Sequence, residues 1–233
     1  MVRYVDLPVY GVPMRLCWKK HRMRCVNGRC AKRTFLLQDH RIAAKKCLLT
    51  TRAAKWATVQ VGCGRTVSEV AGELNCDWHT VNDAVTTYGT ALLAADRKRL
   101  NQTTAIGLDE TSFVRRSAHI HTNYATTVAD VENHQIIDIL PSRNYLDVAG
   151  WIDKKAMPPE IQRLGKTIRK WFDKLCNYHL AKVSNGPTEA LNNLIKRIKR
   201  IGFGFRNFEN YRIRALLYAG KPNWRVLGSI VVR

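Results

Sequence analysis

The middle of the chain carries the pattern that most constrains its fold, because three strand-like segments are followed by a helical one. Residues 105–110 form a short apolar run that ends in two carboxylates. Residues 119–129 and 135–140 have the composition of two further strands. Residues 143–151 have helical character. We therefore expect an α+β fold in which three antiparallel strands lead into a helix.

The two carboxylates, Asp109 and Glu110, lie at the end of the first of these segments. Three strands and then a helix begin a ribonuclease-H-like core, in which a carboxylate in the middle of the first strand holds a divalent metal. The same pair would also occur if the strand simply ended at the surface, so the pattern alone leaves both interpretations open.

Positive charge is concentrated in two parts of the chain, which has 39 lysines and arginines against 18 acids and a formal net charge of +21. Residues 1–60 contain 14 basic residues and two acids, Asp6 and Asp39. Residues 61–165 have a net charge of −3 and residues 166–214 a net charge of +9. This balance excludes an acidic solvating protein and indicates a nucleic-acid partner, because phosphate contacts supply most sequence-independent affinity. A solvated basic surface or a basic RNA-associated structural protein would show the same balance.

The basic N-terminal segment has features of a zinc finger. Alternating apolar and basic residues predict a short strand over residues 16–25. Cys25 and Cys30 then enclose an Asn-Gly turn, and two thiolates this close can be half of a tetrahedral Zn²⁺ site. Cys17 and His21 are available as further ligands but do not make a recognisable second pair. Two free thiols in a basic loop are the alternative.

A helix-turn-helix is predicted downstream of this segment. Residues 40–60 are rich in alanine and helical in pattern, and residues 66–69 (Thr-Val-Ser-Glu) fit a capping box that begins a second helix. After a break at residues 75–77, a third helix has polar residues early on one side, as a recognition helix in a major groove has. A plain helical hairpin is the alternative. The expected base contacts are Thr80 and Asn82, and His79 lies on the same polar side.

Residues 184–189 (Ser-Asn-Gly-Pro-Thr-Glu) predict the start of an amphipathic helix, with capping residues and then proline in the first turn. At about 100° per residue, the apolar residues gather on one side; they are Leu191, Leu194, Ile195 and Ile198. The opposite side holds Glu189, Asn192, Asn193, Lys196 and Arg200. A carboxylate at the helix start can hold a metal while the cations hold phosphates. A solvated basic face with a dipole-favoured glutamate is the alternative.

Together these segments resemble a bacterial insertion-sequence transposase of the Asp-Asp-Glu type, and more narrowly the ISL-three family. The resemblance extends over almost the whole chain. The motifs that carry it are residues 18–35, 66–85, 107–111, 184–192 and 199–212. The last two are long and specific.

The resemblance implies roles for individual residues. Asp109 would be the first catalytic acid and Glu189 the third, and they would hold Mg²⁺ ions that activate water or a 3′ hydroxyl at a scissile phosphate. The reaction would be phosphodiester cleavage and strand transfer at the terminal inverted repeats of the element, which are double-stranded DNA. Family members assemble as multimers, so a homo-oligomer is a further expectation. The residues expected to contact DNA are His79, Thr80, Asn82, Asn192, Asn193, Lys196, Arg197, Lys199, Arg200 and Arg206.

The chain departs from the family pattern in two places. Family members carry another cysteine pair upstream of the one that matches Cys25 and Cys30, so the zinc site here is halved. Only 80 residues separate Asp109 from Glu189, an interval in which family members place a fourth strand and the second catalytic aspartate. The acids near that interval are Asp138, Asp147 and Asp153. We therefore expect an internal deletion, a shortened N-terminus and a defective catalytic core.

The predicted organisation has four segments. They are a zinc-finger-like remnant at 1–38, a helix-turn-helix region at 39–100, the first part of a truncated ribonuclease-H-like core at 101–160, and its basic C-terminal helical part at 161–233. No apolar run reaches the roughly 18 residues that span a bilayer, and no export signal is recognised. We expect a bacterial cytoplasmic, nucleoid-associated protein.

Two functions compete on this basis. One is a transposase-family protein that binds the terminal inverted repeats but has lost its chemistry. The other is a DNA-binding-only derivative that competes with a full-length transposase. Metal-dependent cleavage separates the two.

Overall fold

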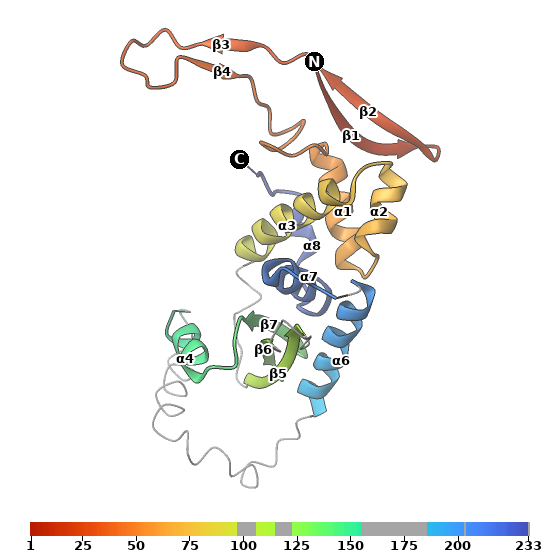
Figure 1. Cartoon of the computed structure of the whole chain (residues 1–233), viewed down its shortest axis with the longest axis vertical. Coiled ribbons are helices and arrows are strands. Elements are labelled where there is room, and N and C mark those ends of the chain that lie inside the picture. The colour runs from red at the N-terminus through yellow and green to blue at the C-terminus, as the bar shows by residue number, and fades with distance from the viewer. Residues whose placement is uncertain (97–105, 115–122, 155–185, 203, 233) are drawn as a thin grey trace, which may run out of the picture. The chain divides into compact units, whose positions relative to one another are not determined.

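A computed structural model describes residues 1–96, 106–114, 123–154, 186–202 and 204–232 (Figure 1). The chain divides into two compact units, of which the first comprises residues 1–96 and 223–233 and the second residues 97–222. No helix of the described ranges is long and apolar enough to cross a membrane.

The first unit begins with two antiparallel β-hairpins. β1 (Val2–Val9) pairs with β2 (Val12–Trp18), and β3 (Arg22–Arg24) pairs with β4 (Thr34–Leu36). The turn between β1 and β2 consists of Tyr10 and Gly11, whose φ angles of 51° and 77° are both left-handed. Such two-residue turns match the twist of the strands they join. The predicted strand at 16–25 therefore divides into the end of β2 and the short β3.

Three helices follow: α1 (Thr51–Gly62), α2 (Val67–Leu74) and α3 (Trp78–Ala95), with the short α8 (Trp224–Leu227) packed on α3. The predicted capping box is confirmed, because Glu69 N donates to Thr66 Oγ1 (3.1 Å) and Thr66 N donates to Glu69 Oε2 (2.9 Å). Asn75 ends α2 in the left-handed region, at φ 50°, and turns the chain toward α3. The buried core of these helices includes Ala53, Ala57, Val70, Leu74, Val85 and Leu92.

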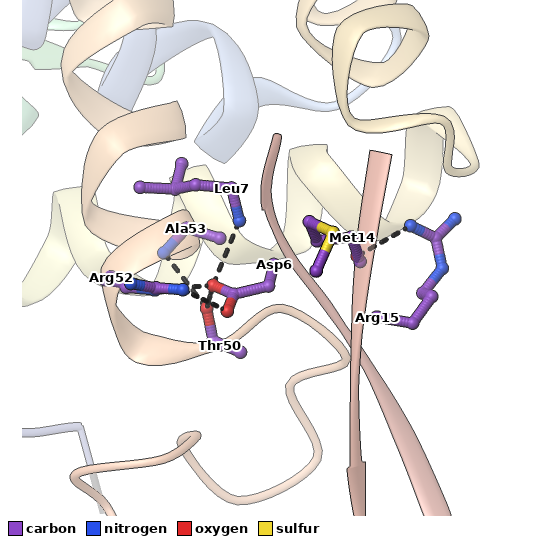
Figure 2. Close-up of polar contacts among 7 residues, drawn as sticks. All are labelled: Asp6, Leu7, Met14, Arg15, Thr50, Arg52 and Ala53. Atoms are coloured by element: carbon purple, nitrogen blue, oxygen red, sulfur yellow. Dashed lines mark hydrogen bonds and ion pairs between the residues drawn. The ribbon is translucent and has the colours of Figure 1, made fainter. Parts of the chain in front are cut away.

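The buried carboxylate of Asp6 fixes the first hairpin to the start of α1 (Figure 2). It accepts hydrogen bonds from Thr50 Oγ1 (2.7 Å), Arg52 Nε (2.7 Å) and Leu7 N (2.9 Å). The same Thr50 hydroxyl caps α1 by accepting from Ala53 N (3.2 Å). The Arg52 guanidinium, bonded to this carboxylate, holds the pKa of Asp6 below its ordinary value of 3.8. One acid thus ties a strand to a helix N-terminus.

The second unit is built on a three-stranded antiparallel sheet, as predicted. Its strands are β5 (Ile106–Val114), β6 (Asn123–Asp130) and β7 (Gln135–Leu140), in the order β5-β6-β7. The predicted second strand began at residue 119, but residues 115–122 lie outside the described part of the chain. α4 (Tyr145–Lys154) follows the sheet, close to the helical segment predicted at 143–151.

The two faces of this sheet are covered differently. α4 packs an apolar layer on one face, where Val128, Ile137 and Leu140 meet Val148, Trp151 and Ile152. α6 (Gly186–Ile201) packs on β5, and α7 (Phe208–Ala219) packs on α6 and β7. The predicted apolar side of α6 is buried at Leu191, Ile195 and Ile198 and half-buried at Leu194.

Candidate functional site

A close contact between β5 and the first turn of α6 involves neighbours of the two predicted catalytic acids. Gly107 of β5 leaves no room for a side chain, because a Cβ there would lie 2.3 Å from Oγ1 of Thr188. Thr188 is buried and directly precedes Glu189. Gly107 lies two residues before Asp109, which is about 6.6 Å along a strand. Both acids therefore flank one helix–strand contact.

Further contacts hold α6 along β5. Thr111 Oγ1 donates to Oδ1 of Asn192 at 3.5 Å, and Lys199 Nζ donates to the carbonyl oxygen of Ser112 at 2.7 Å. Asn192 is only 4% exposed. These side chains are used inside the fold, which does not fit the DNA contacts predicted for Asn192 and Lys199.

The sheet face at this contact is polar. Strand alternation places Asp109 on the same face as Gly107, and Asp109 pairs in register with Thr127 of β6. Cross-strand neighbours have Cβ atoms about 4.5–5.5 Å apart. Thr127 is fully buried, and its hydroxyl has no hydrogen-bond partner among the described residues. An orphaned buried hydroxyl beside a half-buried carboxylate calls for a further group, such as water or an ion.

The two acids can be tested for their fit to Mg²⁺. Asp109 is half-buried and its Oδ1 accepts from Glu110 N at 2.7 Å, while Glu189 is exposed. Mg²⁺ binds through one or two carboxylates and keeps several waters, so this pair fits one ion. Two ions would place four positive charges against two negative ones. Within the described ranges no three His, Cys, Asp or Glu side chains gather at one point, so those residues do not fit a two-ion site.

Two of the three acids near the missing second catalytic aspartate accept hydrogen bonds from other side chains. Asp138 is buried, and its Oδ1 accepts from Arg212 Nε (2.8 Å) while its Oδ2 accepts from Trp151 Nε1 (2.7 Å). Asp147 accepts a hydrogen bond from a serine hydroxyl just before α4. The side chain of Asp153 lies outside the described residues.

On the predicted recognition helix α3, the three polar residues differ in exposure. His79 is exposed and Thr80 is half-buried, but Asn82 is only 6% exposed. α3 packs against both α1 and α2, so its buried face is wider than a single stripe and includes Asn82. A base contact by Asn82 does not fit this burial. His79 is exposed on the predicted polar side of α3.

The outer side of α6 is basic, as predicted. The exposed members of the predicted DNA-contact set in this part of the chain are Asn193, Lys196, Arg197, Arg200 and Arg206.

The long motif around residues 199–212 also has a structural role. The buried guanidinium of Arg214 lies 4.8 Å from the ring centroid of Phe205, and burial lowers the pKa of Arg214 to about 10. A Cβ at Gly202 would lie 2.8 Å from the same ring. The glycine therefore permits the aromatic ring to cover the arginine.

Cys25 and Cys30 lie on either side of the tip of the β3–β4 hairpin. Cys25 N donates to Arg33 O (2.9 Å), Cys30 N donates to Asn27 O (3.0 Å), and both cysteines are half-buried. Residues 1–96 are all described, and no third histidine, cysteine or acid joins this pair there. The Zn²⁺ site predicted at this pair therefore stays a prediction.

Sequence reasoning missed β1 and its carboxylate Asp6. The signal for this hairpin was present, because Tyr10 and Gly11 stand between two valine-containing runs at the length of a two-residue turn. It also missed the close contact at Gly107 and the buried hydroxyl of Thr127, because both depend on strand register.

Comparisons with known proteins identify both regions. Residues 38–89 match a family model described as the helix-turn-helix domain of transposase family ISL3, and residues 145–215 match the ISL3 family model described as transposase. The chain belongs to the ISL3 (ISL-three) family of transposases. Glu189 lies inside the second match, and Asp109 lies outside both.

A curated relative, an "ATP-dependent protease" from Lactococcus lactis subsp. lactis, is 35% identical over 79 residues. These residues are 34% of this chain and 26% of that protein, so the chain spans about a quarter of the relative's length. No solved structure matches the chain.

Proposed function

We propose that this chain binds duplex DNA at the terminal inverted repeats of its insertion sequence and performs little or no strand transfer. The observation that carries the binding proposal is the helix-turn-helix of α1–α3, whose third helix presents the exposed His79 near its start. A recognition helix contacts base edges through residues near its N-terminus. The basic segment 1–60 supplies the charge that attracts phosphates.

The proposed loss of chemistry rests on the carboxylates. Asp109 and Glu189 fit one Mg²⁺, which when bound would act as a Lewis acid on a phosphate oxygen. In-line phosphoryl displacement of the two-metal type needs a clamp on both the attacking and the leaving oxygen. Asp138 is held by Arg212 and Trp151 and cannot complete that clamp. We interpret the short interval between Asp109 and Glu189 as an internal deletion.

Binding is tested by titrating the full chain into a duplex that carries the element's end and into a scrambled duplex of the same length. We expect tighter binding to the end duplex at physiological salt. Equal affinity for the two would contradict recognition of the inverted repeats. Stronger binding to RNA of the same sequence would favour an RNA-associated protein instead.

A second candidate is Mg²⁺-dependent cleavage of the DNA end. The contact between Gly107 and Thr188 supports it, because Asp109 and Glu189 lie close in sequence to these two residues. Cleavage that is lost on Asp109→Ala would establish it.

A chain that binds the ends without cleaving them would compete with a full-length transposase. It would act on nucleoid DNA in the cytoplasm, and pairing of two ends would need a homo-oligomer. Adding this chain to a transposition reaction of an active relative should reduce the yield. An unchanged yield at saturating binding would exclude competition.

A further inference from the structure

The helix-turn-helix of the first unit has few lysine or arginine side chains that could contact phosphates. α2 and α3 contain no lysine or arginine. The three cations of α1 and the loop after it are already engaged. Arg52 is bonded to Asp6, Lys55 Nζ donates to Gly228 O (2.6 Å), and Arg65 pairs with Glu73 (2.6 Å). Half or more of the hydrogen bonds in protein–DNA complexes go to phosphate and sugar, so another element must supply them.

The β1–β2 hairpin is fixed to the helix-turn-helix at the middle of β1. Val5 N donates to Leu48 O and Thr50 N donates to Val5 O, both at 2.9 Å, so the strand is bonded to the backbone just before α1. The bonds of Asp6 to Thr50 and Arg52 lie next to this bridge (Figure 2). The hairpin is therefore a part of the unit and not a loose arm.

A second anchor lies on β2, beside the turn that leads to the recognition helix. Arg15 Nη1 donates to Leu74 O at 3.3 Å, and its Nη2 donates to Asn75 O. These carbonyl groups end α2, three residues before α3 begins at Trp78. A guanidinium is well suited to the negative end of a helix. The hairpin thus lies next to the helix start that would face the groove.

The chain that leaves this hairpin carries cations with nothing to neutralise them. The side chains of Arg22 and Arg24 on β3, and of Lys19 before it, are exposed and have no ion-pair or hydrogen-bond partner in the described part of the chain. The acids of residues 1–46 are Asp6 and Asp39. Asp6 is bonded to Arg52, and Asp39 pairs with Arg41. Arg22 and Arg24 share one side of β3, about 6.6 Å apart.

We propose that the β1–β2 hairpin is a wing of the DNA-binding unit, and that the segment leading from it into β3 presents Lys19, Arg22 and Arg24 to the phosphates of duplex DNA beside the groove that α3 enters. This inference rests on the proposed function and specifies how the site holds DNA. The helices read the bases, and the wing supplies the counter-charge that α2 and α3 lack. Arg15 and Asp6 are positioning residues that set where this charge lies.

The test is the salt dependence of duplex binding by the full chain carrying Arg22→Gln and Arg24→Gln. Each phosphate contact contributes about 0.9 to the slope of log K against log salt for B-form DNA. We expect the slope to fall by about 1.8 on both the end duplex and the scrambled duplex. The charge-preserving pair Arg22→Lys and Arg24→Lys should retain the slope, which excludes a folding defect. Arg41→Gln, a matched control in which the cation is already paired with Asp39, should leave the slope unchanged.

A second variant separates a fixed wing from a charged tail. Arg15→Met removes the anchor on α2 while leaving the cations of β3 in place. We expect affinity for the end duplex to fall at least fivefold, and affinity for the scrambled duplex to change less. An unchanged slope in the double glutamine variant, with wild-type binding intact, would overturn the wing and leave the proposed function standing. Failure of the wild type to bind duplex DNA would overturn both.

Discussion

The two compact units use their acidic side chains in opposite ways. In the first unit the acids build the fold: Asp6 anchors a hairpin to Arg52, Glu73 pairs with Arg65, and Glu69 completes a capping box. In the second unit Asp109 and Glu189 have no cationic partner among the described residues. The surface left over in the first unit is therefore positive. In the second unit two carboxylates without a cationic partner in the described ranges lie beside the basic outer side of α6.

Asp138 of the second unit is bonded inside the fold, and replacing it tests whether it is structural. We expect Asp138→Ala to lower the free energy of unfolding by about 3 kcal/mol, because it leaves Arg212 and the buried Trp151 N–H without their acceptor. Urea denaturation measures this. Glu209→Ala removes the exposed acid that pairs with the same arginine at 3.6 Å and should cost at most about 0.5 kcal/mol. A loss of stability in Asp138→Ala no larger than in Glu209→Ala would show that Asp138 does not stabilise the fold.

Gly107→Ala tests the contact between β5 and α6 that lies beside Asp109 and Glu189. A Cβ 2.3 Å from Thr188 Oγ1 forces α6 away from β5, and we expect a loss of about 2 kcal/mol in the free energy of unfolding. Adding Thr188→Ala to this variant should restore part of the lost free energy of unfolding. Gly150→Ala is the matched control, because nothing lies within 4 Å of a Cβ there and the change should stabilise α4 by about 0.5–1 kcal/mol. A tolerated Gly107→Ala would mean that α6 does not pack closely on β5.

His79→Ala and Asn82→Ala should separate DNA recognition from stability on one helix. Loss of the exposed His79 should weaken binding to the end duplex about tenfold, since a good base contact is worth about 1–3 kcal/mol. The buried Asn82 should instead lower the melting temperature. Fluorescence anisotropy and thermal melts of both variants make the comparison. A selective loss of end binding in Asn82→Ala, with stability unchanged, would restore it as a base contact.

Lowering the pH should weaken the contacts of the Asp6 carboxylate, with a smaller effect on stability than the core substitutions above. The pKa of Asp6 is lowered in the folded protein by its bond to Arg52, so its charge contributes stability above its ordinary pKa of 3.8 and that contribution is lost as the pH falls further. Against Asp6→Asn, the wild type should be more stable by about 1–2 kcal/mol from pH 7 to about 4. The difference should narrow below pH 4. A difference that is constant down to pH 2 would contradict the ionised anchor.

Local patterns were enough to predict the parts of the fold that depend on neighbours in sequence. The capping box at Thr66, the three strands of the second unit and the apolar side of α6 all follow from periodicity and cap chemistry. Asn82 and Asn192 are buried because each helix packs on more than one element, which widens its buried face. Such packing depends on the tertiary arrangement and is not encoded in a helical stripe. The DNA contacts predicted for them stay predictions.

The candidate catalytic site shows the same division. Asp109 and Glu189 were predicted from motif positions and stay predictions. The contact of Gly107 with Thr188 and the orphaned hydroxyl of Thr127 depend on strand register. The DNA side was predicted as a helix-turn-helix. The anchoring of the first hairpin by Asp6 was not predicted, because its partners Thr50 and Arg52 lie more than forty residues away.

The central claim is that DNA binding has outlived strand cleavage. The most direct measurement is Mg²⁺-dependent cleavage of a duplex that carries the element's own end, with Asp109→Ala alongside and binding followed in the same samples. We predict a retarded DNA band with no cleavage in either protein. Cleavage by the wild type that disappears in Asp109→Ala would contradict the claim and would mean that the chain supplies a further carboxylate to the site.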